Sequence, residues 1–444
     1  MKPEERGPYL QSLLEQKSTG EVREYFASLH PSDVADLLED LNEDERLWVL
    51  SILPTELASE SLAEMEEAEH PGELLTRLDP DRVDELVAEL ADDDAADLIG
   101  ELGPEEQARV LSTVEGGDEI QELLEYPEET AGGIMTRDLI AVPSGHTCGE
   151  ALDEIRRQAA EMEDFYSIFV TDRNGNLRGV VSLQDLVLAQ PGTPILEEVE
   201  DPPALVSVET DQEDVGRALS RYNMASIGVV DPLNRLVGRV TFDDVIDVIE
   251  AETTEDILRF AAVSDEEEVR GGTREAIRSR LPWLIANLGT AALAASVVWY
   301  YQDTIDAIVT LAAVMPIIAG MGGNAGTQAL AVTVRRIAVA DESLTERWRV
   351  VGKEVVVGLV NGLVLGGILA LAGLFLAGQP MYGLVVMMAM WGNLIVASFA
   401  GAFIPIFLES LGVDPAVASS IFVTALTDLA GFFLLLGLAS ALLL

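Results

Sequence analysis

The sequence predicts a multidomain, mostly helical protein, and three observations support this fold class. Negative charge is concentrated in residues 1–280, long apolar stretches fill 281–444, and a strand-and-helix pattern occurs twice before the apolar part. In chain order we expect an all-α superhelical N-terminal domain over 1–129, a tandem α/β pair over 130–250 (repeats 130–190 and 191–250), a long connecting helix over 251–280 and a five-helix α transmembrane domain over 281–444.

The overall charge excludes one class of partner. The 444 residues include 27 Lys+Arg and 77 Asp+Glu, a net charge of −50. Residues 281–444 hold nine of the acids and five of the bases, which leaves −46 on residues 1–280. A protein that wraps nucleic acid needs Lys and Arg to displace counterions, so no nucleic-acid partner is expected. The single Cys rules out a disulfide framework and a thiolate metal cluster.

The N-terminal domain shows short helical periods with repeated helix-start signals. Pro31, Pro80 and Pro104 each follow a His, Asp or Gly and stand where a first helical residue is expected. Proline is favoured there because its missing N–H would have no partner anyway. The starts recur at irregular intervals, which predicts a superhelical stack of short helices; its simplest role is that of a spacer.

The α/β part contains an internal repeat with an offset of 59 residues. SIFVTDRNGNLRGVVSLQDLV (167–187) matches SIGVVDPLNRLVGRVTFDDVI (226–246). Each repeat reads as strand, turn, strand and helix, and a preceding helix (148–160 or 211–223) completes a βαββα pattern. Two such repeats, each with an exposed sheet face, usually pair to bury it.

This repeat resembles a tandem of cystathionine-beta-synthase (CBS) domains. In nucleotide-binding members of that family, a Gly-x-Val-Ser/Thr-x-x-Asp segment contacts ribose and phosphate. The resemblance makes ATP a candidate ligand, although many CBS pairs only sense other signals or dimerise. The matching positions are Ser182 and Asp185 in the first repeat and Thr241 and Asp244 in the second.

Acidic residues gather in two runs, ADDDAAD (91–97) and DDVIDVIEAETTED (243–256). Like charges three or four residues apart on a helix repel by ~0.2–0.5 kcal/mol per pair, so clustered acids need counterions. A divalent ion meets that need with oxygen ligands alone, which favours divalent sensing. Two alternatives stay open: a solvated acidic face, and a halophilic surface with acids spread over it.

The C-terminal part predicts a multi-pass protein of the lipid bilayer. Each of its five apolar stretches has the ~20 residues that cross the hydrocarbon core. The N-terminal segment MKPEERGPYLQ lacks the apolar core of a signal peptide, so we expect a cytoplasmic N-terminus. The stretches are roughly 282–301, 307–334, 355–378, 383–408 and 415–443.

The bases near the membrane predict the same orientation. All five bases after Leu281 lie between the second and third spans, and Arg278 and Arg280 precede the first span. The positive-inside bias places both groups in the cytoplasm. The chain then crosses the cell (plasma) membrane five times, and its C-terminus is extracytoplasmic.

Asp428 stands near the middle of the fifth span. A carboxylate there costs at least ~2.5–3.5 kcal/mol on insertion scales. No Lys or Arg after Leu281 lies at the same depth, so a buried ion pair is a poor explanation. An acid without a base in the membrane normally faces a water-filled path or an ion, which makes Asp428 the main functional candidate.

The second span carries a second unusual pattern. Pro316 removes a backbone donor, and the four glycines that follow each lower helix propensity by ~1 kcal/mol, which predicts a break with free carbonyls. Close helix packing through glycines is the alternative, but it does not call for Asn324 and Gln328 on one face. Carbonyls and amides beside a lone carboxylate suit a hard cation such as Mg²⁺, although K⁺ filters also use carbonyls.

The order of the parts and these motifs together resemble the MgtE family of magnesium channels. The most specific element is Pro316 followed by GGNAGTQ (322–328), with Ala-Leu-Thr-Asp428 in the fifth span. The resemblance implies a homodimer with a pore between the two membrane parts, closed at high and open at low cytosolic Mg²⁺. It assigns a largely hydrated Mg²⁺ in the pore to Asp428, Thr424, Gly322 and Asn324.

The resemblance also implies where regulatory Mg²⁺ binds. Ions would bridge acids of the N-terminal domain, the CBS pair and the connecting helix, and the connecting helix would then plug the pore. Asn223 stands where family members can have Asp, which weakens the implied site between the repeats. The implied positions are Asp93, Asp97, Asp244, Asp247, Glu252, Glu255, Asp256 and Asp414, with Glu60, Gly133 and Glu213 as further matches.

Two other functions are alternatives. One is a carrier, proton-coupled or specific for another divalent cation such as Mn²⁺ or Co²⁺, in which Asp428 is the proton site. The other is a CBS-regulated enzyme. The histidines are His30, His70 and His146, and none belongs to a catalytic Ser/Cys/Asp constellation. Cys148 opens a predicted helix, where it is more typical of packing, so we expect no enzyme.

Overall fold

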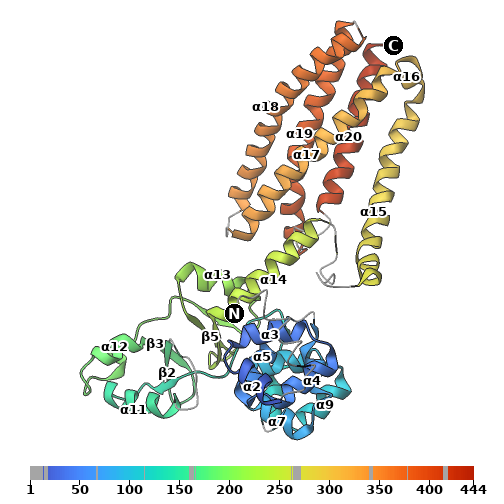
Figure 1. Ribbon diagram of the computed structural model, residues 1–444. Helices are drawn as coiled ribbons and strands as arrows, with labels where there is room; N and C mark the ends of the chain where they lie inside the picture. Colours follow the sequence, from blue (N-terminus) through green and yellow to red (C-terminus); the bar gives the residue numbers. More distant parts are fainter. Residues whose placement is uncertain are drawn as a thin grey trace. The chain divides into compact units, whose positions relative to one another are not determined.

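The computed structural model describes residues 14, 19–66, 69–114, 116–159, 165, 167–261, 263, 272–339, 344–377, 379–413 and 419–444. The chain divides into two compact units, unit 1 (Met1–Ala251) and unit 2 (Glu252–Leu444). Unit 1 holds the short helices and the strands, and unit 2 holds the long helices (Figure 1).

Unit 1 begins with a stack of short helices, as predicted. Pro31, Pro80 and Pro104 each occupy the first turn of a helix, which confirms the start signals. Asn42 and Glu45 form a capping box at the start of α4. The helices are α2 (Thr19–Phe26), α3 (Pro31–Glu39), α4 (Glu43–Ile52), α5 (Thr55–Ala63), α6 (Pro71–Leu75), α7 (Pro80–Val87), α8 (Asp92–Gly100), α9 (Pro104–Leu111) and α10 (Gly117–Leu123).

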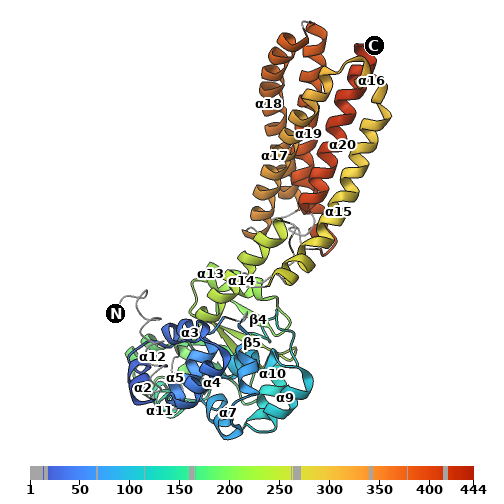
Figure 2. The same ribbon diagram turned by 45° about the vertical axis from the view of Figure 1, so that its right-hand side comes forward.

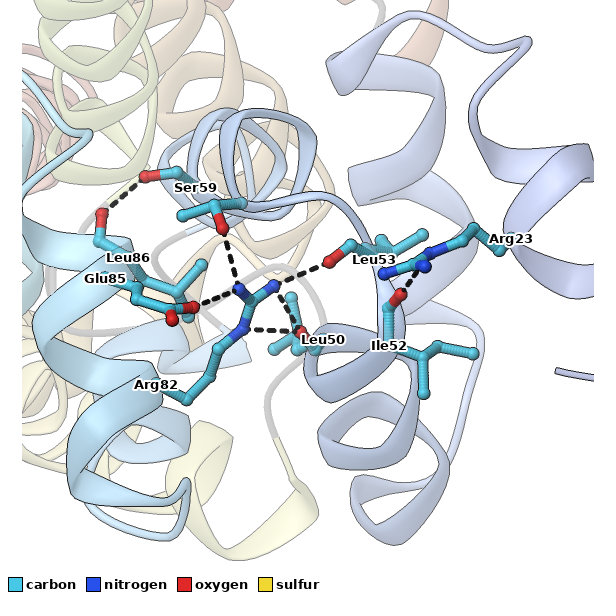
Figure 3. Close-up of polar contacts among 9 residues, drawn as sticks. Arg23, Leu50, Ile52, Leu53, Ser59, Arg82, Glu85 and Leu86 are labelled. Carbon is cyan, nitrogen blue, oxygen red and sulfur yellow. Dashed lines mark hydrogen bonds and ion pairs between the residues drawn. The ribbon is translucent and has the colours of Figure 1, made fainter. Parts of the chain in front are cut away.

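Arginine side chains tie together helices of this stack that are not adjacent in the sequence (Figure 3). Arg82 of α7 donates hydrogen bonds to the carbonyls of Leu50 (3.0 Å) and Leu53 (2.7 Å) at the end of α4. Arg23 of α2 donates to the carbonyl of Ile52 at 2.8 Å. The last carbonyls of a helix have no partner within the helix, so these bonds satisfy groups that close packing would otherwise leave bare.

The predicted repeat is confirmed strand by strand. In each repeat the first strand runs parallel to the second, which pairs antiparallel with the third. The two hairpins have the same register and carry a bulge at the equivalent place. The elements are β1 (Ala141–Pro143), α11 (Cys148–Gln158), β2 (Ser167–Thr171), β3 (Leu177–Ser182) and α12 (Leu183–Leu188), then η2 (Ile195–Glu197), β4 (Leu205–Ser207), α13 (Gln212–Tyr222), β5 (Ser226–Val230), β6 (Leu236–Thr241) and α14 (Phe242–Phe260).

The two repeats contribute differently to the core of unit 1. Val240 and Val245 of the second repeat belong to one continuous buried cluster with Ile99 of α8. The first repeat has a smaller core of its own. The buried ring of Phe169 in β2 lies against Gly228 of β5, so the two sheets meet as expected. The second repeat is therefore the part that joins the N-terminal helices.

Unit 2 is a bundle of long helices (Figure 2). α19 packs against α17, α18 and α20, and α15 packs against α20. Four stretches of the described chain are long and apolar enough to cross a membrane: Ala276–Tyr300, Glu346–Ala372, Pro380–Ser410 and Ser420–Leu442. The elements are α15 (Thr273–Tyr300), α16 (Gln302–Ala307), α17 (Thr310–Val339), α18 (Leu344–Ala377), α19 (Pro380–Ser410) and α20 (Ser419–Leu442).

The predicted break in the second span is wrong. α17 is one continuous helix from Thr310 to Val339, with Pro316 inside it. Gly322 and Gly326 are buried where α17 meets its neighbours, so these glycines serve close packing, the alternative considered above. α17 is long enough to span a bilayer, but its glycines and amides make it less apolar than the four stretches above.

Candidate functional site

Asp428 is half-buried on α20 and lines a cavity of about 560 Å³ between α15, α16 and α20. Ala291, Ala294 and Ala295 of α15 form much of its apolar wall, and Asp306 of α16 is its second carboxylate. Asp428 has no hydrogen bond or ion pair with any residue that the structure describes. A carboxylate that faces a hollow without a counter-charge is what a cation site requires.

Two threonines shape α20 just before Asp428. The Thr424 hydroxyl donates to the carbonyl of Ser420 (2.8 Å), and the Thr427 hydroxyl donates to the carbonyl of Thr424 (2.9 Å). A hydroxyl bonded in this way keeps its lone pairs, so the half-buried Thr424 oxygen can still accept a hydrogen bond from an ion's water. Thr427 is fully buried and lies against Gly322 of α17.

Of the four predicted pore residues, Asp428 alone lines this cavity. Gly322 is buried against Asn393 of α19. The opposite side of α17 is free of neighbours among the described residues, since nothing lies within 4 Å of the Cβ position at either of its glycines. We call this side the open face; its residues are Gly320, Gly323, Asn324 and Gln328.

A second candidate site lies within unit 1, where α8 meets the start of α14. Asp93 is 8% exposed, and its Oδ1 atom has no hydrogen-bond partner among the described residues. The carboxylates of Asp93 and Asp94 are repelled by acids of α14, and that of Asp94 is also repelled by Glu64, the residue after α5. We call this group the acid cluster; it consists of Glu64, Asp93, Asp94, Asp243, Asp244 and Asp247.

Burial and mutual repulsion raise the pKa values of these carboxyls. Desolvation, followed by the charges of Asp244 and Glu64, raises the pKa of Asp94 to about 6. Desolvation and Asp244 hold the pKa of Asp93 well above its ordinary value. The pKa of Asp244 is also raised by burial, although Thr241 donates hydrogen bonds to its carboxylate. A cation entering the acid cluster would relieve this repulsion.

The acid cluster is not a closed metal cage in this conformation. Within the described ranges, no three His, Cys, Asp or Glu side chains converge closely enough to hold one ion. Mg²⁺ commonly keeps several waters and takes one or two carboxylates, so this spacing suits an ion bound partly through water. Asp97 lies one turn further along α8 with an exposed side chain, and Glu60 lies one turn before Glu64.

The other predicted regulatory positions lie outside the acid cluster. Gly133 occupies a tight turn in which a Cβ would come within 2.6 Å of the Pro127 carbonyl. Glu213 forms an ion pair with Arg217 at 3.0 Å. Of the positions in unit 2, Glu252 is half-buried on α14 and Glu255 pairs with Arg259. The side chain of Asp256 and the whole of Asp414 lie outside the described residues.

In both repeats the predicted nucleotide-binding positions are hydrogen-bonded to each other at the start of a helix. Ser182 Oγ accepts the N–H of Asp185 (3.0 Å) at the start of α12, and the N–H of Thr241 donates to Asp244 (3.1 Å) before α14. In both pairs the hydroxyl also donates to the Asp carboxylate. These are helix-cap interactions, and a helix start also favours a phosphate. Asp244 belongs both to this motif and to the acid cluster.

Sequence reasoning missed four residues of these sites. One of them, Asp243, lies in the acidic run 243–256 next to the predicted Asp244. Asp94 lies within the acidic run 91–97, but the sequence did not show which carboxylates of a short helix face a neighbour. Glu64 stands one helical turn after the predicted Glu60, and that spacing was the available signal. Asp306 belongs to the loop expected outside the membrane, and only the packing of α16 on α20 brings it near Asp428.

Known proteins resemble this chain over almost its whole length. The model of the MgtE divalent cation transporter family matches residues 315–438, that of the MgtE intracellular N domain matches 29–129, and the CBS domain model matches 131–192 and 196–251. The magnesium transporter MgtE of Thermus thermophilus is 36% identical over 453 residues, which cover 98% of each chain. The chain belongs to the MgtE family. The MgtE of Enterococcus faecalis is 38% identical over 98% of this chain and 97% of its own.

Two solved structures resemble a little over half of this chain. The crystal structure of the cytosolic domain of the Mg²⁺ channel MgtE in complex with ATP is 37% identical and covers 54% of this chain and 98% of its own, with a TM-score of 0.51. The soluble part of a magnesium transporter is 31% identical over 56% of this chain and 99% of its own, also with a TM-score of 0.51. Membership of the MgtE family confirms the resemblance inferred from the sequence motifs.

Proposed function

We propose that this MgtE-family chain carries Mg²⁺ through the cell membrane as a transporter rather than an enzyme, and that Asp428 is the residue the ion meets. A carboxylate in a membrane bundle costs several kcal/mol unless water or a cation compensates it. Asp428 lines a cavity and has no counter-charge among the described residues, which is the observation that carries the proposal. Carboxylate oxygens suit Mg²⁺, Asp306 is a second carboxylate at the same cavity, and relatives over the full length are magnesium transporters.

In this proposal a homodimer completes the path. The open face of α17 holds small and amide residues. In a single copy this face would contact lipid, which does not stabilise such residues, whereas another helix could pack against them. A second copy would enclose these faces and bring two Asp428 carboxylates to one hydrated ion, helped by the Thr424 hydroxyl and by Gly322 and Asn324 of α17. Two carboxylates match the usual need of Mg²⁺.

The proposed orientation places unit 1 in the cytoplasm. Arg278 and Arg280 precede the first span, and Arg335 and Arg336 end α17, so both groups fall on one side of the membrane when the spans alternate. The positive-inside bias assigns that side to the cytoplasm. Five crossings then put the C-terminus outside the cell.

Cytosolic Mg²⁺ closes the path in this proposal. At high Mg²⁺, ions bound at the acid cluster and at Asp97, Glu60, Gly133, Glu213, Glu252, Glu255, Asp256 and Asp414 favour the compact arrangement by mass action. At low Mg²⁺ the acids repel, the domains separate and the path opens. ATP bound at the capped helix starts of the CBS repeats would act on the same compact arrangement. The reason is that Asp244 belongs both to the nucleotide-binding motif and to the acid cluster.

The test is Mg²⁺ uptake by vesicles that contain the purified full chain. Asp428→Asn keeps the size of the side chain and removes its charge, so we expect uptake to fall at least tenfold. Asp303→Asn, on the exposed side of α16, is the control and should keep uptake near that of the unchanged chain. Equal uptake by Asp428→Asn and the unchanged chain would refute the proposed role.

A proton-coupled or other divalent-cation carrier is the second candidate, because Asp428 could hold a proton as well as a metal ion. The two functions differ in their energy source. An uncoupler that collapses the proton gradient stops a proton-coupled carrier and leaves Mg²⁺ flux through a passive path unchanged. Mn²⁺ and Co²⁺ uptake measured in the same vesicles reports which ion is preferred.

A further inference from the structure

We propose that Asn393 of α19 is a positioning residue that sets the spacing between α17 and α20 beside Asp428, and through it the preference for Mg²⁺ over the larger Ca²⁺. The inference deepens the proposed function, on which it rests. Asn393 has 0% exposure in the middle of the membrane bundle. Its Nδ2 atom donates to the carbonyl of Ile318 on α17 at 3.0 Å, one turn before Gly322.

The chemistry of Asn393 argues against a role as packing filler. Its Oδ1 atom is buried and has no hydrogen-bond partner in the part of the chain that the structure describes. A buried polar atom without a partner is unfavourable, and a leucine of nearly the same shape would avoid it. The amide therefore contributes something that an apolar residue cannot, and the hydrogen bond to Ile318 is that contribution.

Glycines on both neighbouring helices make room for this amide. At Gly322 of α17 a Cβ would overlap Asn393 Nδ2, and at Gly431 of α20 a Cβ would come within 2.9 Å of the same atom. The amide thus lies between α17 and α20, next to the direct contact of Thr427 with Gly322, and it helps to set how closely the two helices approach. Asp428 stands between Thr427 and Gly431 on α20, and both of these face this junction.

Spacing at this level bears on ion choice because the two ions differ in size and rigidity. Mg²⁺ demands near-ideal octahedral geometry with oxygens at about 2.0–2.1 Å, whereas Ca²⁺ accepts irregular shells at about 2.3–2.6 Å. A path that binds hydrated Mg²⁺ needs the Asp428 carboxylate at a fixed position. Loosening the contact between α17 and α20 would admit the more adaptable ion.

The test compares Mg²⁺ and Ca²⁺ flux through the full chain in vesicles. Asn393→Leu keeps the shape and removes the donor, and Asn393→Ala removes the amide altogether. We expect each to lower the Mg²⁺/Ca²⁺ flux ratio at least fivefold, about the effect of losing one buried hydrogen bond. Ser398→Ala is the matched control, since Ser398 is buried on α19 but packs against Gly358 of α18. A ratio does not depend on how much protein folds.

Size compensation provides a second readout. Gly322→Ala alone should also lower the flux ratio, because its methyl group meets the amide. In the double variant Gly322→Ala with Asn393→Ala, the methyl group occupies part of the vacated space, so the ratio should be higher than the product of the two single effects. It should stay below that of the unchanged chain, because the donor to the Ile318 carbonyl is still missing. An unchanged ratio in both Asn393 variants, or a double variant equal to the product of the singles, would overturn the inference. If Asp428→Asn also stops Mg²⁺ flux in that case, the proposed function stands without it.

Discussion

At the scale of single residues, carboxylates without partners mark both candidate sites. Asp172, in the hairpin of the first repeat, shows the opposite case. Hydrogen bonds from the Asn176 side chain and the Asn174 N–H lower its pKa to about 2, so its charge is fully compensated. Asp94 has the same side chain, but burial and neighbouring acids raise its pKa to about 6. The difference separates an acid whose charge is stabilised by hydrogen bonds from one whose charge is opposed by burial and by neighbouring acids.

Replacing Asp94 with Asn should stabilise the contact between α8 and α14 when Mg²⁺ is absent. The folded-state pKa lies above the ordinary value of 3.8, so the compact state binds the proton more tightly. Its stability is therefore greatest below about pH 4 and falls as pH rises through about 6, by ~3 kcal/mol for the full shift. Asp94→Asn should make this decline shallower without abolishing it, because the pKa values of Asp93 and Asp244 are raised as well. Hydrogen exchange of α8 amides from pH 4 to 7 measures the change.

The control for this measurement is Glu89→Gln, an exposed acid of the same domain outside the acid cluster. It should leave the pH dependence of exchange as it is in the unchanged chain. Two results would contradict the assignment of repulsion to Asp94. One is protection of α8 amides that rises between pH 4 and 7 in the unchanged chain, and the other is a pH dependence of protection that Asp94→Asn leaves unaltered.

At the scale of elements, local patterns predicted the structure well and packing supplied the rest. The offset of 59 residues predicted the hairpins β2–β3 and β5–β6, and the prolines predicted helix starts. The predicted break at Pro316 was wrong because α17 continues and its glycines receive neighbouring side chains. Asn393 could not be singled out from the sequence, because the role of an amide in an apolar helix depends on its contacts with neighbouring helices.

Arg82 gives a prediction about the stack of short helices. Arg82→Met keeps much of the apolar stem but removes the donors to Leu50, Leu53 and Thr55. Hydrogen bonds from charged donors contribute about 1.5–3 kcal/mol each and are not additive, so we expect α4 and α5 to lose ~2–3 kcal/mol of stability. Hydrogen exchange of their amides in the full chain measures the loss. Arg109→Met, at an exposed position of α9, should change little.

At the scale of the whole molecule, α14 links the two units through the chain itself. It begins at the acid cluster with Asp243 and Asp244 and continues as one helix into unit 2. Its last residue, Phe260, packs within unit 2 against a buried cluster that includes Leu330 of α17 and Val423 of α20. A helix shared in this way can transmit a change at the acid cluster to the helices around Asp428, which is the coupling that the proposed gating requires.

Millimolar Mg²⁺ should protect the full chain from limited proteolysis within residues 90–130 and 250–275. The reason is that bound cations offset the repulsion that otherwise opens unit 1. K⁺ at the same ionic strength controls for general screening of charge. If Mg²⁺ and K⁺ give equal rates of cleavage in these segments, the proposed Mg²⁺ sensor is wrong. The acids would then be only an adaptation of the protein surface.

The most direct test of the central claim is the current through the chain reconstituted in a planar bilayer under a Mg²⁺ gradient. A path for a free divalent ion shifts the reversal potential by about 30 mV per tenfold change in Mg²⁺. We predict this shift for the unchanged chain and for Asp303→Asn, and no Mg²⁺ current for Asp428→Asn. A Mg²⁺ current of normal size through Asp428→Asn would contradict the account.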